Sequence, residues 1–180
     1  MALIVYYFLI MKKKHLFNDQ QLSQIKVAAS HAEELVSDEY KLTSSQWLKH
    51  TYELKTMRDL LPEEIVDVPF AQLIRYRGQK KETHLGSYAY DFYKICIQDH
   101  NIITTIKKTN DLKFYPFMLY VISHELIHII RFSKFLQNFQ ATEDEKLKEE
   151  KRVHKKTHSI LKNLSIDGID PVINFKGWWL

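Results

Sequence analysis

The sequence predicts an α+β fold, with a small antiparallel sheet in the middle of the chain and helices on both sides of it. The middle segment is rich in Tyr, Phe and Ile, a composition typical of strands, and a polar stretch divides it into two. The flanking segments have helical composition, and the whole chain contains only four glycines and four prolines to interrupt them. The 180 residues fit a single domain, with a mostly helical part over about 1–62 and a second part over about 63–180.

Composition and charge narrow the classes of function. Lys and Arg number 26 against 22 Asp and Glu, a net charge of +4, and the positive residues are mixed with acidic ones along the chain. This pattern is typical of solvated helix faces, so no nucleic-acid partner is expected. The single cysteine, Cys96, cannot form an intramolecular disulfide and lies in an apolar run, where it is expected to be core rather than a nucleophile. The lack of a disulfide framework favours the cytoplasm.

The N-terminal run "MALIVYYFLI" is followed by "MKKK". Its ten residues are fewer than the roughly 20 that a membrane-spanning helix needs, and its positive charge follows the apolar run instead of preceding it, as it would in a secretory signal. No membrane span is therefore expected. The run could form a buried edge strand, or translation could start at Met11, which would remove it.

Two helices are predicted before the sheet. The first covers about residues 18–38, with Asn18 or Asp19 as its cap. The second covers about residues 44–60, and Pro62 follows its end.

Two strands are predicted in the middle of the chain, "FAQLIRYRG" at 70–78 and "YAYDFYKICIQD" at 88–99. They are expected to pair as a hairpin across the polar loop at 79–87. The next segment, "NIITTIKK" at 101–108, fits either a short helix or a third strand.

A long helix is predicted from about residue 115 to about Asn138, with Pro116 in its first turn. Its residues are apolar nearly all round, which predicts a central, buried helix. The next helix starts with the capping box "TEDE" at 142–145. Its expected inner stripe consists of Leu147, Glu150, His154, Thr157 and Leu161. The tail ends in Trp178 and Trp179, which either pack back over the domain or mark an interaction patch.

The segment "VISHELIHIIRF" carries the clearest chemical signal. His124 and His128 are four residues apart, so one face of a helix can bring both imidazoles to one cation. Glu125, about 100° further round the helix, is suited to take a proton from a water activated by that cation, as general base. Because the flanking residues are apolar, two histidines and a glutamate would be buried at a cost unless a cation or another partner compensates them.

A third ligand is expected on the following helix. If the turn between the helices centres near residue 140, His154 lies level with the two histidines, and Glu150 lies one turn lower. His154 is therefore the preferred third ligand. Glu150 is the alternative, or it supports a ligand imidazole through a hydrogen bond. An electrophile for an oxyanion could come from one of several residues, but no pattern singles one out among Tyr88, Tyr90, Tyr93, Tyr120 and Arg75.

The His-Glu-Leu-Ile-His motif at 124–128 resembles that of the HExxH zinc metallopeptidases, the zincins. The resemblance covers about Tyr115 to Leu164. It implies a zincin-like core over about 63–180, with a small sheet, an active-site helix and an antiparallel helix that carries the third ligand. It also implies Zn²⁺, hydrolase activity and a peptide or protein substrate. The subgroup stays open, because Arg131 and Lys134 replace the Gly and His of metzincins, and His154 replaces the Asp of gluzincins.

Two other readings of the motif use a metal differently. "ELIH" is also Glu-x-x-His, which four-helix di-metal carboxylate proteins use twice. The second copy would need Glu at position 151, where this chain has Lys151. Alternatively, a cation could have a purely structural role and join the helices, in a site closed by four protein ligands. No cysteine lies near the motif to complete such a closed site, which favours an open one.

Overall fold

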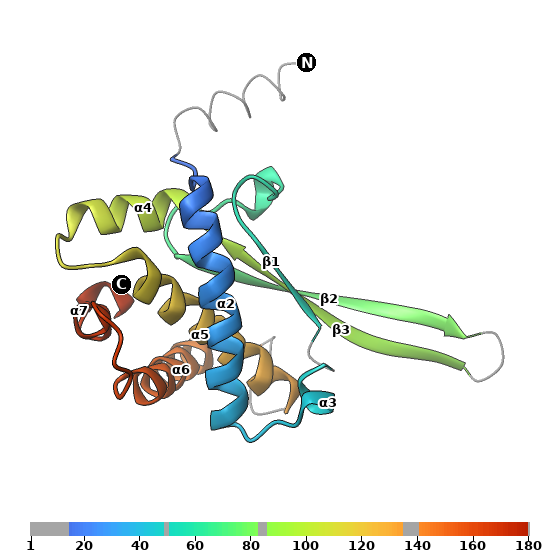
Figure 1. Ribbon diagram of the computed structural model, residues 1–180. Coiled ribbons are helices and arrows are strands. Elements are labelled where there is room, and N and C mark those ends of the chain that lie inside the picture. The colour runs from blue at the N-terminus through green and yellow to red at the C-terminus, as the bar shows by residue number, and fades with distance from the viewer. Residues whose placement is uncertain (1–14, 49–50, 83–85, 135–140, 180) are drawn as a thin grey trace, which may run out of the picture. The chain divides into compact units, whose positions relative to one another are not determined.

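The computed structural model describes residues 15–48, 51–82, 86–134 and 141–179 (Figure 1). In chain order the elements are α2 (Asp19–Glu39), α3 (Ser44–Trp47), β1 (Tyr52–Lys55), the 3₁₀ helix η1 (Pro62–Glu64), β2 (Ala71–Glu82), β3 (Gly86–Ile97), α4 (Asp99–Lys108), α5 (Phe114–Ser133), α6 (Glu143–Leu161), α7 (Ile169–Ile173) and the 3₁₀ helix η2 (Lys176–Trp179). The predicted α+β class is confirmed. The apolar run at the N-terminus, for which an edge strand was one of two options, lies outside the described residues.

The chain divides into two compact units, and each unit is assembled from two separate stretches of sequence. Unit 1 comprises Met1–Phe17 and Leu48–Thr105, and unit 2 comprises Asn18–Trp47 and Ile106–Leu180. No helix in the described ranges combines the length and the apolar character that crossing a membrane requires.

Unit 1 contains a three-stranded sheet in the order β1-β3-β2. β2 and β3 form the predicted antiparallel hairpin, paired from Ala71 opposite Ile97 to Glu82 opposite Gly86, and Figure 1 shows the two strands side by side. β1 instead runs parallel to β3, with Tyr52 opposite Tyr93. The sheet is therefore mixed, and the prediction of a wholly antiparallel sheet is wrong for this strand.

The helix predicted over 44–60 is also wrong beyond Trp47, where α3 ends. Tyr52–Lys55 forms β1, because β3 offers these residues hydrogen-bonding partners that lie about forty positions away in the sequence. Helical composition is a weak preference that such tertiary pairing overrides. Residues 101–108, left open between helix and strand, belong to α4.

The core of unit 1 lies along β3. Ile95, Cys96 and Ile97 are fully buried, so the prediction that Cys96 is a core residue is confirmed. Next to this strand, the Asp99 carboxylate accepts hydrogen bonds from the backbone N–H groups of Phe17 and Met57, each at 3.0 Å. The bond from Phe17 joins the two sequence stretches of the unit, since Asp99 and Met57 both belong to the second stretch.

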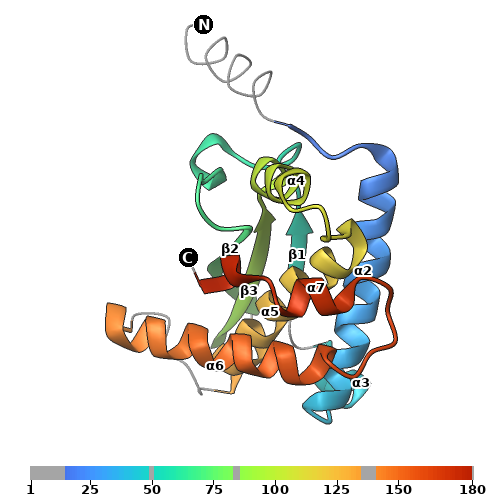
Figure 2. The same cartoon turned by 90° about the vertical axis from the view of Figure 1, so that its left-hand side faces the viewer.

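Unit 2 is built around α5. α2 begins with a capping box between Asn18 and Gln21, as predicted for Asn18, and α2, α6 and α7 all contact α5. Figure 2 shows α6 lying across α5. Every residue of α5 from Pro116 to Ile130 is buried, so the prediction of a central helix is confirmed. α5 ends at Ser133, earlier than the expected end near 138, and residues 135–140 lie outside the described part.

α6 starts with the predicted capping box, in which the Thr142 hydroxyl accepts a hydrogen bond from the Glu145 N–H and the Glu145 carboxylate accepts one from the Thr142 N–H at 2.9 Å. The inner stripe is predicted correctly at His154, Thr157 and Leu161, all buried. The prediction is wrong at Leu147, which is 56% exposed, because the helix is rotated so that Glu149 and Val153 face inward.

The C-terminal tail packs back over α5, one of the two predicted outcomes. The Trp178 ring stacks on Tyr120, with centroids 4.0 Å apart, and on Phe117 at 4.8 Å. Its indole N–H donates to the carbonyl of Val172 at 2.7 Å. The side chain of Trp179 is outside the described set.

Candidate metal centre

The two motif histidines converge on one point. His124 and His128 lie one turn apart on α5, both buried, with ring centroids 4.8 Å apart. Their Nε2 atoms are 3.1 Å from each other. The spacing of four residues therefore brings the two imidazoles together, as predicted.

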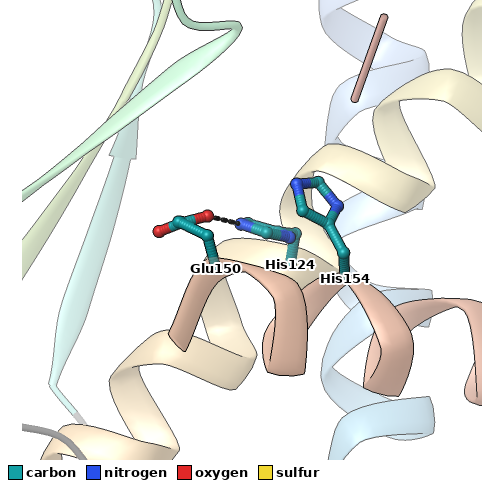
Figure 3. A group of neighbouring side chains, drawn as sticks. All are labelled: His124, Glu150 and His154. Carbon is teal, nitrogen blue, oxygen red and sulfur yellow. Dashed lines mark hydrogen bonds and ion pairs between the residues drawn. The ribbon is translucent and has the colours of Figure 1, made fainter. Parts of the chain in front are cut away.

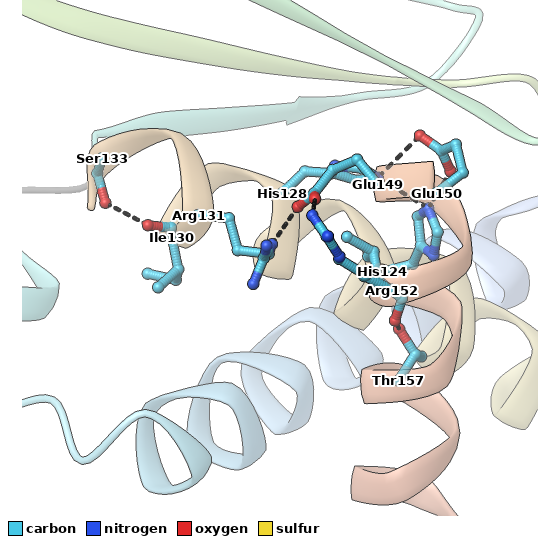
Figure 4. A network of polar contacts seen from close by, with 10 residues as sticks. His124, His128, Ile130, Arg131, Ser133, Glu149, Glu150, Arg152 and Thr157 are labelled. Carbon is cyan, nitrogen blue, oxygen red and sulfur yellow. Dashed lines mark hydrogen bonds and ion pairs between the residues drawn. The ribbon is translucent and has the colours of Figure 1, made fainter. Parts of the chain in front are cut away.

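Glu150, on α6, contacts both histidines (Figures 3 and 4). Its Oε2 lies 3.2 Å from the Nε2 atom of His124, and its Oε1 lies 3.1 Å from the Nε2 atom of His128. Burial alone would raise the pKa of the Glu150 carboxyl, but hydrogen bonds and positive charge from the two histidines lower it well below its usual range. Glu150 is therefore a carboxylate, a suitable metal ligand.

The contacts of Glu150 show that it is level with the two histidines. The preference for His154 assumed that α5 extends to about residue 138 and that the turn centres near residue 140. α5 ends at Ser133 instead, and both Glu150 and His154 lie near His124.

His154 joins the same group from α6. Its ring centroid is 4.3 Å from that of His124, and one donor atom from each of His124, Glu150 and His154 lies within 4.8 Å of the others. Figure 3 shows the three side chains together. Burial, helped by the charge of His124, lowers the pKa of His154 to about 3, so its ring is neutral at physiological pH. Both candidates for the third ligand are therefore in the group.

Protons alone cannot satisfy the three contacts among His124, His128 and Glu150. A carboxylate only accepts hydrogen bonds, so each Nε2 that bonds to Glu150 must carry a proton. Two such N–H groups would then face each other across the 3.1 Å between the histidines. A single cation bound by all three groups would resolve this conflict. Ligands arranged as a tetrahedron about 2.0–2.1 Å from zinc lie roughly 3.3 Å apart, close to the observed 3.1–3.2 Å.

Glu125, the predicted general base, is buried on the same helix. Burial raises the pKa of its carboxyl, the positive charges of His124 and His128 oppose the rise, and the negative charge of Glu150 adds to it. Glu125 directly follows His124 on α5 and is therefore a neighbour of the group in the chain.

An ion pair that the sequence does not predict joins α6 to α5. The Arg131 Nε atom donates to Glu149 Oε1, and the Arg152 Nη1 atom donates to Glu149 Oε2 at 3.2 Å (Figure 4). Glu149 is buried directly before Glu150. The sequence does not distinguish Glu149 from the other glutamates of this charged segment. Which glutamate faces inward depends on the rotation of α6.

One feature departs from ordinary zinc sites. A histidine that binds zinc through one nitrogen usually donates the proton of its other nitrogen to an acceptor. The Nδ1 atom of His124 is buried and has no hydrogen-bond partner among the described residues. Among the described residues, the polar contacts of the His124 ring are therefore those of its Nε2 atom, with Glu150 and His128.

Comparison of the chain with protein-family models, with curated proteins and with solved structures found no match.

Proposed function

We propose that the chain is a zinc-dependent hydrolase, most simply a small metallopeptidase, in which His124, His128 and Glu150 hold the metal. The observation that carries this proposal is the contact of one carboxylate with both Nε2 atoms of an HExxH motif, on a buried helix. Between the two candidates for third ligand, Glu150 is favoured, because it is the one with a contact to each histidine. The resemblance of the motif to that of the zincins supports the same reaction class and a zincin-like core.

In the proposed reaction Glu125 is the general base. Zinc, when bound, acts as a Lewis acid and makes water more acidic. Glu125 takes a proton from the attacking water as the new C–O bond forms. It then gives that proton to the leaving amine as the C–N bond breaks, so no further acid is required. A carboxyl whose pKa is raised by burial suits a group that must both accept and release a proton.

A peptide or protein substrate and a cytoplasmic location belong to the same proposal. The substrate class rests on the resemblance of the motif. The location is supported by the cysteine content, because a chain whose single cysteine is Cys96 forms no intramolecular disulfide and needs no oxidising compartment.

A non-catalytic metal site is the second candidate, and one observation favours it. His124, Glu150 and His154 each have a ligand atom within 4.8 Å of the others, and His128 contacts both His124 and Glu150. If all four bound one cation, they would close a tetrahedral site and leave no position for water. In that case the cation would only join α5 to α6. A di-metal carboxylate centre, with a redox-active or structural role, would instead require Glu125 as a ligand.

Metal content separates these functions from a metal-free protein. The wild type should purify with, or take up, about one equivalent of zinc, measured by elemental analysis. His124→Ala, His128→Ala and Glu150→Ala should lose the metal, whereas Lys148→Ala, a change of an exposed residue on the same helix as Glu150, should keep it. A wild type that binds no divalent cation rules out all three metal functions.

The Glu125→Gln variant then tests catalysis. It should retain the metal and lose hydrolysis of an unfolded protein substrate, because the amide cannot accept the water's proton. If the variant hydrolyses as fast as the wild type, Glu125 is not the base. If the metal-loaded wild type hydrolyses nothing while all four candidate ligands prove necessary for binding, the structural site is the better description.

A further inference from the structure

We propose that Tyr120 fixes the tautomer of His154, so that the Nε2 atom of His154 carries the proton and faces the metal centre as a hydrogen-bond donor, not as a ligand. This inference rests on the proposed function in placing a metal at His124, His128 and Glu150. It assigns separate roles to the two residues that the sequence offered as third ligand.

The contact that carries the inference is a buried hydrogen bond. Tyr120, on α5 four residues before His124, is 1% exposed, and its hydroxyl oxygen is 2.8 Å from the Nδ1 atom of His154. Among the described residues, this nitrogen is the sole hydrogen-bond partner of that hydroxyl. The hydroxyl proton therefore has one acceptor available in the described part of the chain.

Counting protons selects one of two arrangements. The Tyr120 hydroxyl has one proton to donate, and the Nδ1 atom of His154, at 2.8 Å, either accepts that proton or donates its own to the hydroxyl oxygen. If the hydroxyl donates to Nδ1, the proton of the ring lies on Nε2, and both groups are satisfied along the bond. If Nδ1–H donated to the hydroxyl oxygen instead, the hydroxyl proton would be buried without an acceptor among the described residues, which costs free energy. The first arrangement is therefore preferred.

Packing holds the hydroxyl in place. The Tyr120 ring stacks on the Trp178 ring, with centroids 4.0 Å apart and 13° between planes, and the His154 ring lies beside both, 6.0 Å from Tyr120 and 6.3 Å from Trp178. The hydrogen bond from the Trp178 indole to Val172 holds the Trp178 ring in place. The Tyr120 ring cannot turn away without breaking the stack, so the hydroxyl stays aimed at Nδ1.

An N–H at the Nε2 atom of His154 has a clear use beside the centre. The His154 ring lies against that of His124, with centroids 4.3 Å apart, and one of its nitrogens is within 4.8 Å of a Glu150 carboxylate oxygen. A neutral donor there can bond to a negative oxygen, either that of Glu150 or the one that develops on the substrate carbonyl. A nitrogen that carries a proton has no lone pair for a metal, so it cannot act as a ligand.

Nuclear magnetic resonance of the full chain with ¹⁵N-labelled histidine tests the tautomer directly. In the metal-free wild type, His154 should show a protonated Nε2 and an unprotonated Nδ1, and the pattern should persist after one equivalent of Zn²⁺ is added. Tyr120→Phe should abolish this preference. The matched control is Tyr115→Phe, which removes another tyrosine–histidine hydrogen bond on α5, to His31 at 2.9 Å, and should leave His154 unchanged.

Zinc affinity gives an independent measurement. The His154→Gln variant keeps an N–H donor, so it should lose no more than the roughly 10–100-fold in Zn²⁺ affinity that is typical of residues that only support a ligand. The Glu150→Gln variant should lose more than that. A protonated Nδ1 in the wild type, or a His154 nitrogen that shifts on coordination, would overturn the inference. The tautomer is measured in the metal-free protein, so the two hypotheses are tested separately. If zinc does not bind, the proposed function is wrong, and the spectrum of the metal-free protein still decides the tautomer of His154.

Discussion

The buried ion pair of unit 1 joins Glu64 of η1 to Lys94 of β3. The Lys94 Nζ atom lies 2.7 Å from Oε1 and 2.9 Å from Oε2 of Glu64, and Oε2 also accepts a hydrogen bond from the Leu61 N–H at 2.8 Å. Burial alone would raise the pKa of the Glu64 carboxyl, but these bonds and the charge of Lys94 lower it below its usual value. Each charge is thus compensated by the other.

Replacing Glu64 with Gln should lower the free energy of unfolding at pH 7 by about 3–5 kcal/mol, because Lys94 would stay buried without its counter-ion. Since the folded-state pKa of Glu64 is depressed, its stabilisation is complete above the ordinary value of 4.5 and is lost as pH falls through the lower folded value. The difference in unfolding free energy between the wild type and Glu64→Gln, measured in urea, should therefore become smaller below pH 4.5.

The control for this prediction is Glu53→Gln, which removes a partly exposed partner of Lys55 at 3.3 Å and should change the unfolding free energy by less than about 1 kcal/mol. A difference between wild type and Glu64→Gln that is the same at pH 3 and pH 7 would exclude the ion pair as its cause.

The candidate metal centre shows which residues a sequence can and cannot identify. His124, Glu125 and His128 follow from spacing within one helix, where the geometry is regular. Choosing between Glu150 and His154 depended on where α5 ends, and α5 ends earlier than the sequence predicted. The bond from Tyr120 to His154 joins residues 34 positions apart, and ten tyrosines left no local reason to select this one.

At the scale of elements, ends marked by local hydrogen bonds were predictable, and pairing between distant segments was not. Asn18 and Thr142 cap α2 and α6 as expected, because a capping box involves residues only three positions apart. β1 was missed because β3, about forty residues later, makes it a strand. The same distinction explains why the hairpin of β2 and β3, neighbours in sequence, was found.

The Thr142→Ala variant tests how much the cap contributes to α6, which carries Glu150 and His154. Losing the side-chain bond to the Glu145 N–H should lower the free energy of unfolding by about 0.5–2 kcal/mol. Glu143→Ala, next to the cap, removes only the exposed ion pair with Lys146 and should have a smaller effect. Equal losses in urea unfolding for the two variants would show that the cap does not stabilise the helix.

At the scale of the whole molecule, all the residues of the candidate centre belong to unit 2. The ligands come from α5 and α6, and α2 reaches the same unit from residues 18–47, far earlier in the chain. Unit 2 therefore depends on contacts between distant stretches of sequence, whose ordering costs conformational entropy. A cation that joins α5 to α6 in the folded state would offset part of that cost.

Zinc should consequently stabilise the folded protein in proportion to its binding. A ligand that binds only the native state adds about 2.7 kcal/mol to the free energy of unfolding at 100 times its dissociation constant. The free energy of unfolding of the wild type, measured in urea, should rise by that amount when Zn²⁺ is added and fall back when a chelator removes the metal. The Lys148→Ala variant should respond like the wild type. Glu150→Ala should show no shift, because its two histidines retain their imidazoles but lose the carboxylate that contacts both. A shift of equal size in Glu150→Ala would mean that zinc binds elsewhere on the chain, and the group at α5 and α6 would then have to be explained without a metal.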